Sequence, residues 1–455
     1  MTTMPPPGPP HEEPGLTVPR DQLMEKIVAL SKRRGFVYPS SEIYGGLAAF
    51  YDYGPYGTTL RRTIRELWWR HMVELRDDVV GLESTIIMNP RVWEASGHLA
   101  GFSDPLVQCL GECKERWRAD LLTSDRCPKC GGPLSESRQF NLMFKTFVGP
   151  VEDSASVAYL RPETAQGMFV DFKNIVNSVR VRVPFGIAQQ GRSFRNEITV
   201  QNFIFRVREL EQMEMEFFVR PGTDDEWHAY WIKERLRWFT EELGVTPARL
   251  RARAHEKDEL SHYSKATSDI EYEFPFGWGE LEGVANRTDF DLKAHQEHSG
   301  QDLTYLDPES NERYLPYVIE PALGVERTMI VLLLDAYDED DVRGETRVVL
   351  RFHRNVAPVQ VAVMPLSKKD ELIAPAREVL GLLKPSYRTE YDQTGGNIGR
   401  RYRRQDEIGT PFCVTIDFET LEDRAVTIRE RDSMAQARVP IAGLAARLAE
   451  RFSSS

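Results

Sequence analysis

The sequence has no long hydrophobic run and few cysteines, and each shortage excludes a class of protein. Its longest apolar run, Met329–Leu334, is far shorter than the roughly 18–20 residues that span a bilayer, so we expect no membrane protein. Five cysteines in 455 residues are too few for a small disulfide-stabilised secreted scaffold. The N-terminus also lacks the basic, apolar and small-residue order of a secretion signal. We therefore expect the protein to be cytoplasmic.

Positive charge is also in short supply. Lys and Arg number 58 and Asp and Glu number 70, so the formal net charge is −12. A nucleic acid would therefore have to be held by a local basic patch. Hydrophobic residues make up 41% and charged residues 28% of the chain, which is typical of a folded globular protein. The length predicts about three folding units.

Four of the five cysteines are close together in the sequence. Cys109 and Cys113 form a C-x3-C pair, and thirteen residues later Cys127 and Cys130 form a C-x2-C pair. Two such pairs supply four thiolates from two short loops, which is close to the spacing of a zinc ribbon. The alternative is four reduced cysteines that cluster without a metal. Cys413 lies in a distant apolar run, and we interpret it as a core residue.

Changes in composition predict three parts of the chain. Residues 1–19 are rich in proline, which predicts a disordered tail. Residues 20–355 are expected to form one large domain, with the cysteines in an insertion at 105–138. From 356 to 455, expected strands and helices alternate, which predicts a separate small α/β domain.

Within the large domain, several elements can be placed from their patterns. Short apolar runs alternate with charged loops between 185 and 219, which predicts antiparallel strands. Further strands are expected at 79–88, 280–292 and 314–320, and a helix over 325–336. The acidic and then basic segment 335–351 is expected to be a surface connection.

The segment that carries most chemical information combines arginines with carboxylates. The sequence Phe194-Arg195-Asn196-Glu197 is followed by a loop and then by the run Phe205–Glu216, which reads FRVRELEQMEME. We expect a strand, a loop and a second strand. Such a mixture suits a site that binds a triphosphate and a cationic group side by side. The alternative is a solvated hairpin held by salt bridges.

These two runs resemble motif 2 of the class II aminoacyl-tRNA synthetases, in the form that glycyl-tRNA synthetases have. Segments with the same resemblance follow the family's order along nearly all of the chain after residue 20. They are the N-terminal signature at 33–46 and 51–57, motif 1 at 84–90 with Pro90, glycyl signatures at 159–167 and 280–292, motif 3 at 317–327, and anticodon-binding segments at 399–423 and 426–434.

The resemblance implies an α+β fold. A catalytic domain with an antiparallel sheet flanked by helices would carry a zinc-ribbon-like insertion and be followed by a C-terminal α/β anticodon-binding domain. It also implies a reaction in two steps. Glycine and ATP form glycyl-adenylate and pyrophosphate, and glycine then passes to the 3′-terminal ribose of its tRNA. The first step needs no protein nucleophile, so positioning and charge neutralisation would carry the catalysis.

The same resemblance assigns a nucleotide site. The predicted catalytic residues are Arg195 on the α-phosphate, Glu197 at the adenine edge, and Arg327 on the γ-phosphate or stacked on adenine. Glu280 and Glu282 are expected to hold Mg²⁺. The full set expected to bind ATP is Arg195, Asn196, Glu197, Phe205, Arg206, Val207, Arg208, Glu209, Leu210, Glu280, Leu281, Gly324, Val325, Glu326 and Arg327.

For glycine, the resemblance assigns an ammonium site of three acids, Glu163, Glu214 and Glu320. Buried acids without a cation would be costly, so such a pocket suits an incoming ammonium group. Arg287 and Arg118 are expected to meet carbonyl or phosphate oxygens. The full set expected at the glycine site is Arg118, Glu163, Leu210, Glu211, Gln212, Met213, Glu214, Arg287, Glu320, Pro321, Ala322, Leu323 and Gly324.

The C-terminal domain carries basic residues around an aromatic one, which suits a phosphate backbone and unpaired bases. The residues expected to contact the anticodon loop of glycine tRNA are Arg400, Arg401, Tyr402, Arg403, Arg404, Arg429 and Arg431. The alternative is a helix with a solvated basic face. The family resemblance further implies a homodimer.

Three positions depart from the family's pattern. Val200 replaces a proline in the loop of motif 2, Ala322 replaces a serine of motif 3, and Leu210 replaces an aromatic residue that stacks on adenine. Loss of that ring removes about 0.5–1.5 kcal/mol of stacking. Two other interpretations remain open: a paralogue that activates glycine for another acceptor, and a nucleic-acid-binding relative without activity. The second predicts loss of the phosphate-binding arginines, and these are present.

Overall fold

The computed structural model describes residues 19–200, 202–260 and 264–453, which form two compact units. One unit comprises Ser31–Asp335 and His353–Pro358. The other comprises Ala336–Phe352 and Val359–Ser455 together with the segment up to Leu30. The tail expected at 1–19 lies outside the described residues apart from Pro19. Among the described helices, none has the length and apolar character that a membrane span requires.

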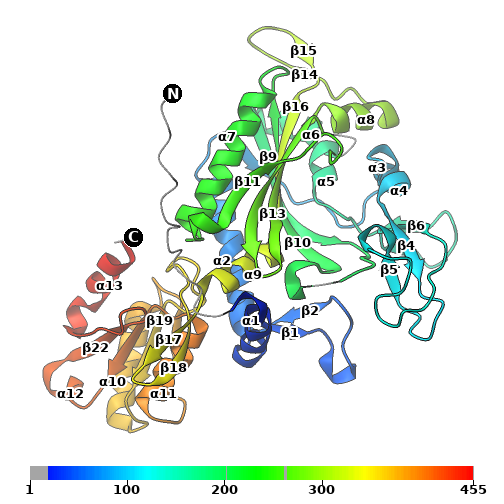
Figure 1. Cartoon of the computed structure of the whole chain (residues 1–455). Helices are drawn as coiled ribbons and strands as arrows, with labels where there is room; N and C mark the ends of the chain where they lie inside the picture. The colour runs from blue at the N-terminus through cyan, green and yellow to red at the C-terminus, as the bar shows by residue number, and fades with distance from the viewer. Residues whose placement is uncertain (1–18, 201, 261–263, 454–455) are drawn as a thin grey trace, which may run out of the picture. The chain divides into compact units, whose positions relative to one another are not determined.

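The larger unit is built on a seven-stranded sheet with the order β11-β12-β13-β16-β10-β9-β3 (Figure 1). All neighbours are antiparallel except β3, which runs parallel to β9. The prediction of an antiparallel sheet is therefore confirmed. The strands are β3 (Val79–Gly81), β9 (Phe185–Phe194), β10 (Glu209–Val219), β11 (Leu250–Ala254), β12 (Ala266–Phe274), β13 (Gly277–Thr288) and β16 (Tyr317–Gly324).

Helices pack on this sheet and around it, and two of them begin at clear start signals. Helix α7 (Asp224–Arg237) has three acidic residues in its first turn, which suits the positive end of the helix dipole, and it packs on β13 and β16. Helix α3 (Pro90–Ala95) begins with a proline, and the Asn89 side chain accepts a hydrogen bond from the Arg91 amide at 3.0 Å. Pro90 of the motif-1-like segment therefore starts a helix.

A second apolar layer fixes the part of the sheet that carries the site. Phe172 of α6 (Phe172–Val179) stacks on Phe185 of β9 and Phe218 of β10, with ring centroids 6.1 and 4.6 Å apart. Helix α5 (Ala165–Val170) packs against the same two strands and against α8 (Phe290–Ser299). Because β10 is covered on both faces, nearly all of its residues are buried, including its glutamates.

The remaining elements of the larger unit are helix α2 and a set of short helices and strands. They are β1 (Val37–Pro39), β2 (Tyr51–Tyr53), α2 (Pro55–Trp69), α4 (His98–Gly101), β4 (Ser103–Gln108), β5 (Arg116–Arg118), β6 (Arg138–Asn141), β7 (Lys145–Phe147), β8 (Val157–Tyr159), β14 (Tyr305–Leu306) and β15 (Arg313–Tyr314). Irregular helical turns lie at Glu42–Tyr44, Arg70–Glu74, Ala119–Leu121, Phe203–Phe205, Trp238–Glu242 and Pro247–Arg249. Strands β5, β4 and β6 form the small sheet of the cysteine-bearing insertion.

The smaller unit is an α/β sandwich, as the alternation of strands and helices predicts. Its sheet has the order β20-β19-β21-β22-β23, with β19 parallel to β20 and β21 and the other pairs antiparallel. The elements are β19 (Val361–Pro365), α10 (Asp370–Leu383), β20 (Thr389–Tyr391), α11 (Ile398–Ile408), β21 (Phe412–Ile416), α12 (Thr420–Asp423), β22 (Ala425–Glu430), β23 (Gln436–Pro440), a turn at Ile441–Gly443, and α13 (Leu444–Ser453). Helices α10 and α13 share its main apolar core.

Three expectations about elements need correction. The strand expected at 79–88 ends at Gly81, and the strand expected at 280–292 ends at Thr288 because α8 begins at Phe290. The segment 335–351, expected as a surface connection, forms a hairpin of β17 (Tyr337–Val342) and β18 (Glu345–Leu350). Its Arg347 is 1% exposed, so this hairpin belongs to the packed smaller unit. The helix expected at 325–336 is α9 (Val325–Ala336), and α1 spans Arg20–Arg34.

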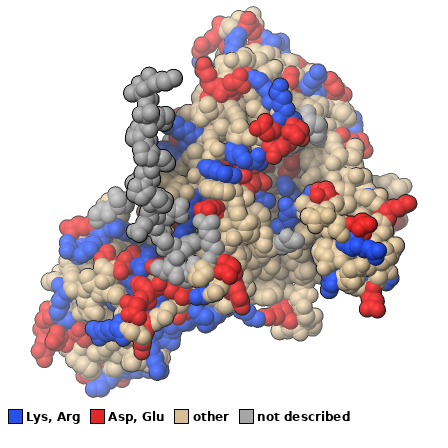
Figure 2. Space-filling model, in the orientation of Figure 1, with Lys and Arg blue, Asp and Glu red and all other residues tan. Residues whose placement is uncertain are grey.

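Basic and acidic side chains are interspersed over the visible face of both units (Figure 2). No large field of one sign stands out in that view. Binding of a charged substrate therefore depends on the local arrangement of side chains in a cavity.

Candidate active site

A cavity of about 340 Å³ opens on the face of the seven-stranded sheet and brings together most of the predicted site. The predicted residues that line it are Glu163, Arg195, Glu197, Phe205, Arg206, Val207, Leu210, Gln212, Glu214, Glu280, Leu281, Glu320, Ala322, Leu323, Gly324, Glu326 and Arg327. They come from β10, β13, β16, the start of α9, the loop between β9 and β10, and, for Glu163, the segment between β8 and α5. Residues as far apart in the sequence as Glu163 and Arg327 thus share one cavity.

Arginines and an aromatic residue form the part of the cavity expected to bind ATP. Arg195 follows the end of β9, and its Nε donates a hydrogen bond to the Pro162 carbonyl at 3.0 Å. The Arg327 guanidinium lies over the Phe205 ring, 4.7 Å from its centroid, and its Nη1 is 3.0 Å from a carboxylate oxygen of Glu280. The Arg327 charge lowers the pKa of Glu280 and so keeps that carboxyl ionised.

Arg208 is placed differently from its prediction. Its Nε and Nη2 donate to the Glu197 carbonyl at 3.1 and 2.9 Å, and its Nη1 donates to the Ala48 carbonyl at 3.0 Å. It does not line the cavity. The expectation that Arg208 binds ATP is corrected here: its guanidinium holds the backbone of the loop that carries Glu197. Asn196, Glu209 and Val325 also lie outside the lining.

A β-bulge separates the two acids predicted to hold Mg²⁺. Strand β12 pairs Glu271 with Glu280 and Ile270 with Glu282, so Leu281 is the extra residue. Glu280 therefore faces the cavity together with Leu281. Glu282 faces the other side of the sheet, where its carboxylate contacts Arg235 of α7 at 2.7 Å. The side chains of Glu282 and Arg235 are both fully buried. The Glu282 prediction is wrong, because its carboxylate is paired behind the sheet.

The three acids predicted for the ammonium group meet at the inner end of the cavity. Glu214 accepts hydrogen bonds from the amide of Thr164, at 3.1 Å, and from its hydroxyl. Glu320 receives Arg287 Nη1 at 2.6 Å. Burial and the nearby acids Glu320 and Glu163 raise the pKa of Glu214 well above its usual value. Burial also acts to raise the pKa of Glu163, but the charge of His98 and its hydrogen bond outweigh burial and lower it.

Five residues predicted at the glycine site do not line the cavity. Arg118 is a correction, because its guanidinium pairs with Asp104 and Asp120 in the insertion. Glu211 is also a correction, because it points to the other side of β10 and pairs with Arg61 and Arg65 of α2, at 2.7 Å each. Met213 lies in the core on that same side, and Pro321 is likewise buried away from the cavity.

Arg287, the fifth of these residues, stands behind the cavity wall. Its guanidinium contacts Asp291 at 2.7 and 2.9 Å in addition to Glu320. It is 2% exposed. The prediction that Arg287 meets a substrate oxygen is corrected: it fixes the carboxylate of Glu320 from behind.

The cavity also contains residues that sequence reasoning missed. His255 Nε2 lies 2.8 Å from a carboxylate oxygen of Asp269, and both line the cavity beside Thr267. Asp269 and Thr267 belong to β12, a strand that was not predicted because its polar residues interrupt the apolar alternation. Gly283 and Ala285 of β13 also line the cavity. Both lie within the glycyl signature at 280–292, and that membership is the signal in the sequence that could have pointed to them.

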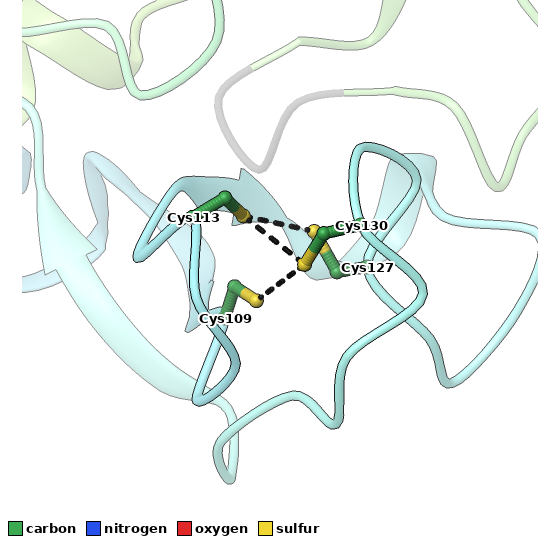
Figure 3. A group of neighbouring side chains, drawn as sticks. All are labelled: Cys109, Cys113, Cys127 and Cys130. Atoms are coloured by element: carbon green, nitrogen blue, oxygen red, sulfur yellow. Dashed lines mark hydrogen bonds between the residues drawn. The ribbon is translucent and has the colours of Figure 1, made fainter.

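The four clustered cysteines converge in the insertion (Figure 3). Three Sγ–Sγ distances are 3.4 Å, namely Cys109 to Cys130, Cys113 to Cys127 and Cys113 to Cys130, and all four Sγ atoms lie within 4.8 Å of one another. A tetrahedron of thiolates about 2.3 Å from zinc has sulfur–sulfur edges of about 3.8 Å, so the donor set fits this ion.

The backbone around these cysteines is shaped for the cluster. A Cβ built at Gly132 would lie 3.0 Å from the Gly111 Cα and 3.3 Å from two of the sulfurs, so the two loops approach each other closely only because both residues are glycine. Burial opposes ionisation of Cys127, but amide groups of Cys130 and Lys129 lower its pKa to about 6.

In the smaller unit, three of the residues expected to contact RNA are buried. Arg401 is 3% exposed and donates to the carbonyls of Pro365 and Asp392. Arg429 makes two hydrogen bonds to Asp406, at 2.8 and 3.0 Å, beneath the ring of Tyr402. These predictions are corrected, because both guanidinium groups are used inside the unit.

The guanidinium of Arg431 is likewise used inside the unit. Its Nη1 donates to the carbonyls of Phe352 and Gly409, each at 3.0 Å, and it is 4% exposed. Tyr402 is half-buried, and its hydroxyl contacts Thr415 at 2.6 Å. Arg400 is exposed, and Arg403 and Arg404 are partly exposed on α11, so all three reach the surface. Arg404 Nη2 also donates to the Thr394 hydroxyl and the Gly395 carbonyl.

Comparisons with known proteins agree with this geometry. Residues 150–336 match a model described as "tRNA synthetase class II core domain (G, H, P, S and T)", and residues 360–451 match one described as "Anticodon binding domain". The prolyl-tRNA synthetase of Cryptosporidium parvum, solved with L-proline and AMP, has a similar fold with a TM-score of 0.66 and 16% identity over 96% of this chain and 77% of its own.

Curated relatives are much more similar in sequence. The glycine–tRNA ligase of Thermobifida fusca is 54% identical over 95% of this chain and 99% of its own length. That of Treponema denticola is 55% identical over 93% of this chain and 96% of its own length. These identities, the two matching family models, and a cavity built from the motifs in the family's order all agree. The chain therefore belongs to the glycine–tRNA ligases of the class II aminoacyl-tRNA synthetases.

Proposed function

We propose that this protein attaches glycine to the 3′-terminal ribose of glycine tRNA, with ATP as the energy source and glycyl-adenylate as the intermediate. The observation that carries the proposal is one cavity with two chemically distinct ends. Arg195, Arg206 and Arg327 suit phosphates at one end, and Glu163, Glu214 and Glu320 suit an ammonium group at the other. A bound glycine would then present its carboxylate toward the phosphates.

In the first step, a carboxylate oxygen of glycine attacks the α-phosphorus of ATP and pyrophosphate leaves. The protein contributes position and charge, since the attacking group comes from the substrate. Arg195 is the residue proposed to stabilise the charge on the α-phosphate, and Arg327 with Phe205 is proposed to hold the other end of the nucleotide. Leu210 lines this end and offers an apolar contact without a ring face.

A class II core implies the use of ATP with Mg²⁺, and Glu280 is the acid proposed to hold that ion. Its carboxylate is ionised, faces the cavity and is half-exposed, as a ligand of a hydrated Mg²⁺ requires. When bound, Mg²⁺ neutralises charge on the leaving pyrophosphate.

The experiment that tests this function is glycine-dependent exchange of pyrophosphate into ATP, followed by charging of purified glycine tRNA. Alanine and serine are the control amino acids. Exchange with glycine alone, together with charging, supports the proposal. Exchange without charging points to a paralogue with another acceptor, and absence of exchange at saturating ATP contradicts both enzymatic interpretations.

We propose further that the C-terminal unit binds the anticodon loop through Arg400, Arg403 and Arg404 on α11. Homodimer formation and a cytoplasmic location remain proposals too. The exposure of Ile86 and Ile87, 37% and 42%, in the motif-1-like segment supports an interface there. Thiols that converge without disulfides suit a reducing compartment.

We also propose that Cys109, Cys113, Cys127 and Cys130 bind zinc, and this gives a direct prediction. The purified protein should contain about one zinc per chain, since four thiolates close a structural site. Cys109→Ser should lose the metal and make the insertion more sensitive to limited proteolysis, because the ion joins its two loops. Cys413→Ser, at a buried cysteine outside the cluster, should keep the metal. Metal analysis that finds no zinc in freshly purified protein contradicts the proposal.

A further inference from the structure

Glu216 is a buried acid that the proposed reaction does not use. It lies on β10 two residues after Glu214, its exposure is 0%, and it does not line the cavity. Neither of its carboxyl oxygens has a hydrogen-bond partner among the described residues. An unpaired polar group at such depth is unfavourable unless it has a function that keeps it there.

The groups that face Glu216 come from every element packed around it, and most are acids. Carboxyl oxygens of Glu214, Glu216 and Glu320 lie within 4.8 Å of one another, from β10 and β16. Arg287 of β13 and Asp291 of α8 are the other charged groups that act on Glu216. Its partner across the ladder to β9 is Ile187, which is apolar.

Positive charge in this cluster is too small to ionise all the acids. Arg287, the one cation that acts on Glu216, already contacts Glu320 and Asp291. Arg161 is the other buried cation near Glu214, and its guanidinium donates to the backbone carbonyls of Arg192 and Ser84. Three ionised carboxylates so close together inside the protein would repel strongly without solvent to screen them. Burial, with Glu320 and Glu214 adding to it, raises the pKa of Glu216 well above its usual value, and that of Glu214 is raised as well.

We propose that Glu216 is a positioning residue of the glycine site that stays a neutral carboxylic acid, and that the ammonium group of glycine displaces one proton from Glu214. The inference rests on the proposed function. In the empty site, Glu214 and Glu216 carry protons. Burial raises the pKa of Glu320 as well, but Arg287 acts to lower it, so Glu320 is the acid of the three that is ionised. When glycine enters with its ammonium charge, Glu214 ionises and its proton goes to the buffer.

A neutral Glu216 suits the glycine site better than an ionised one, because it can donate a hydrogen bond and adds no negative charge. Its hydroxyl is a hydrogen-bond donor within a short side-chain rotation of Glu214 and Glu320, and it adds no charge to them. An ionised Glu216 would add a further negative charge to a cluster in which Arg287 and the ammonium group already face Glu214, Glu320 and Asp291. Proton release from Glu214 also means that glycine binds more tightly as pH rises, until Glu214 is ionised in the empty site.

The experiment measures glycine binding to the full-length protein by calorimetry at pH 7, in phosphate and in Tris. The difference in enthalpy between buffers gives the number of protons released, which we expect to be about one. Glu216→Gln keeps the shape and stays neutral, so release should be unchanged and the KM for glycine in exchange should stay within about threefold. Glu216→Leu removes the donor and should raise that KM more than about tenfold with little change in kcat.

Several outcomes would overturn the inference. They are proton-neutral glycine binding, loss of affinity in Glu216→Gln, and equal effects of Gln and Leu. Over the acidic range, affinity of the wild-type protein for glycine should rise about tenfold per pH unit, and Glu216→Gln should follow the same line. Failure of the proposed function looks different: the wild-type protein then gives no heat with glycine and no glycine-dependent exchange.

Discussion

Arg195→Ala is expected to lower kcat for glycine-dependent ATP–pyrophosphate exchange by about 10³, because one preorganised cationic donor at a developing negative charge contributes a factor of this size. The Arg195 side chain is held by its bond to the Pro162 carbonyl and by the Phe102 ring, 5.7 Å from its guanidinium. These contacts hold the Arg195 side chain in position before the substrate binds. The loss should fall on kcat more than on the KM for glycine, since the acids at the other end are untouched.

Two variants sharpen this test. Arg195→Lys keeps the charge but loses the planar fork, so it should recover a minor part of the rate. Arg192→Ala is the matched control. Arg192 lies three residues earlier, is half-exposed, pairs with Glu209 and does not line the cavity. Equal losses in Arg195→Ala and Arg192→Ala would mean that the measured effect is a general change of charge on this face.

The sequence predicted which segments build the cavity better than it predicted which side chains of those segments face it. The family resemblance assigned the consecutive residues from Leu210 to Glu214 to the glycine site. Successive side chains of a strand point to opposite faces, so Gln212 and Glu214 line the cavity whereas Glu211 and Met213 do not. This alternation fails where a bulge occurs. Nothing in Glu280-Leu281-Glu282 marks Leu281 as the extra residue, so the two acids were assigned together although they face opposite sides.

Arginines were the other source of error. A guanidinium is equally suited to a phosphate, a carboxylate and a backbone carbonyl, so residue type alone does not tell which partner it has. Arg208 donates hydrogen bonds to two backbone carbonyls, Arg429 pairs with Asp406, and Arg118 pairs with Asp104 and Asp120. The partners are distant in sequence, or lie on another element, and only the folded chain brings them together. Arg195 and Arg327 were separated from this group by their motifs.

The buried arginines of the smaller unit lead to the second large effect. Asp406→Ala is expected to destabilise this unit by about 3–5 kcal/mol, because it leaves buried arginine charges without their partner. Asp406 is 0% exposed, receives two hydrogen bonds from Arg429, and lies 3.5 Å from Nη1 of Arg347. Urea denaturation should show an earlier transition for this unit.

In the Asp406→Ala variant, we expect the two activities, pyrophosphate exchange and tRNA charging, to respond differently. Exchange depends on the larger unit and should persist, whereas charging of glycine tRNA should fall, since the surface of α11 is lost when its unit unfolds. Asp432→Ala is the control: Asp432 pairs with Arg431 and Arg351, but its carboxylate is 49% exposed, so its loss should cost less than about 1 kcal/mol. If Asp406→Ala lost charging with an unchanged urea transition, Arg429 would have to act on RNA directly. Its buried pair with Asp406 would then be a state that tRNA opens.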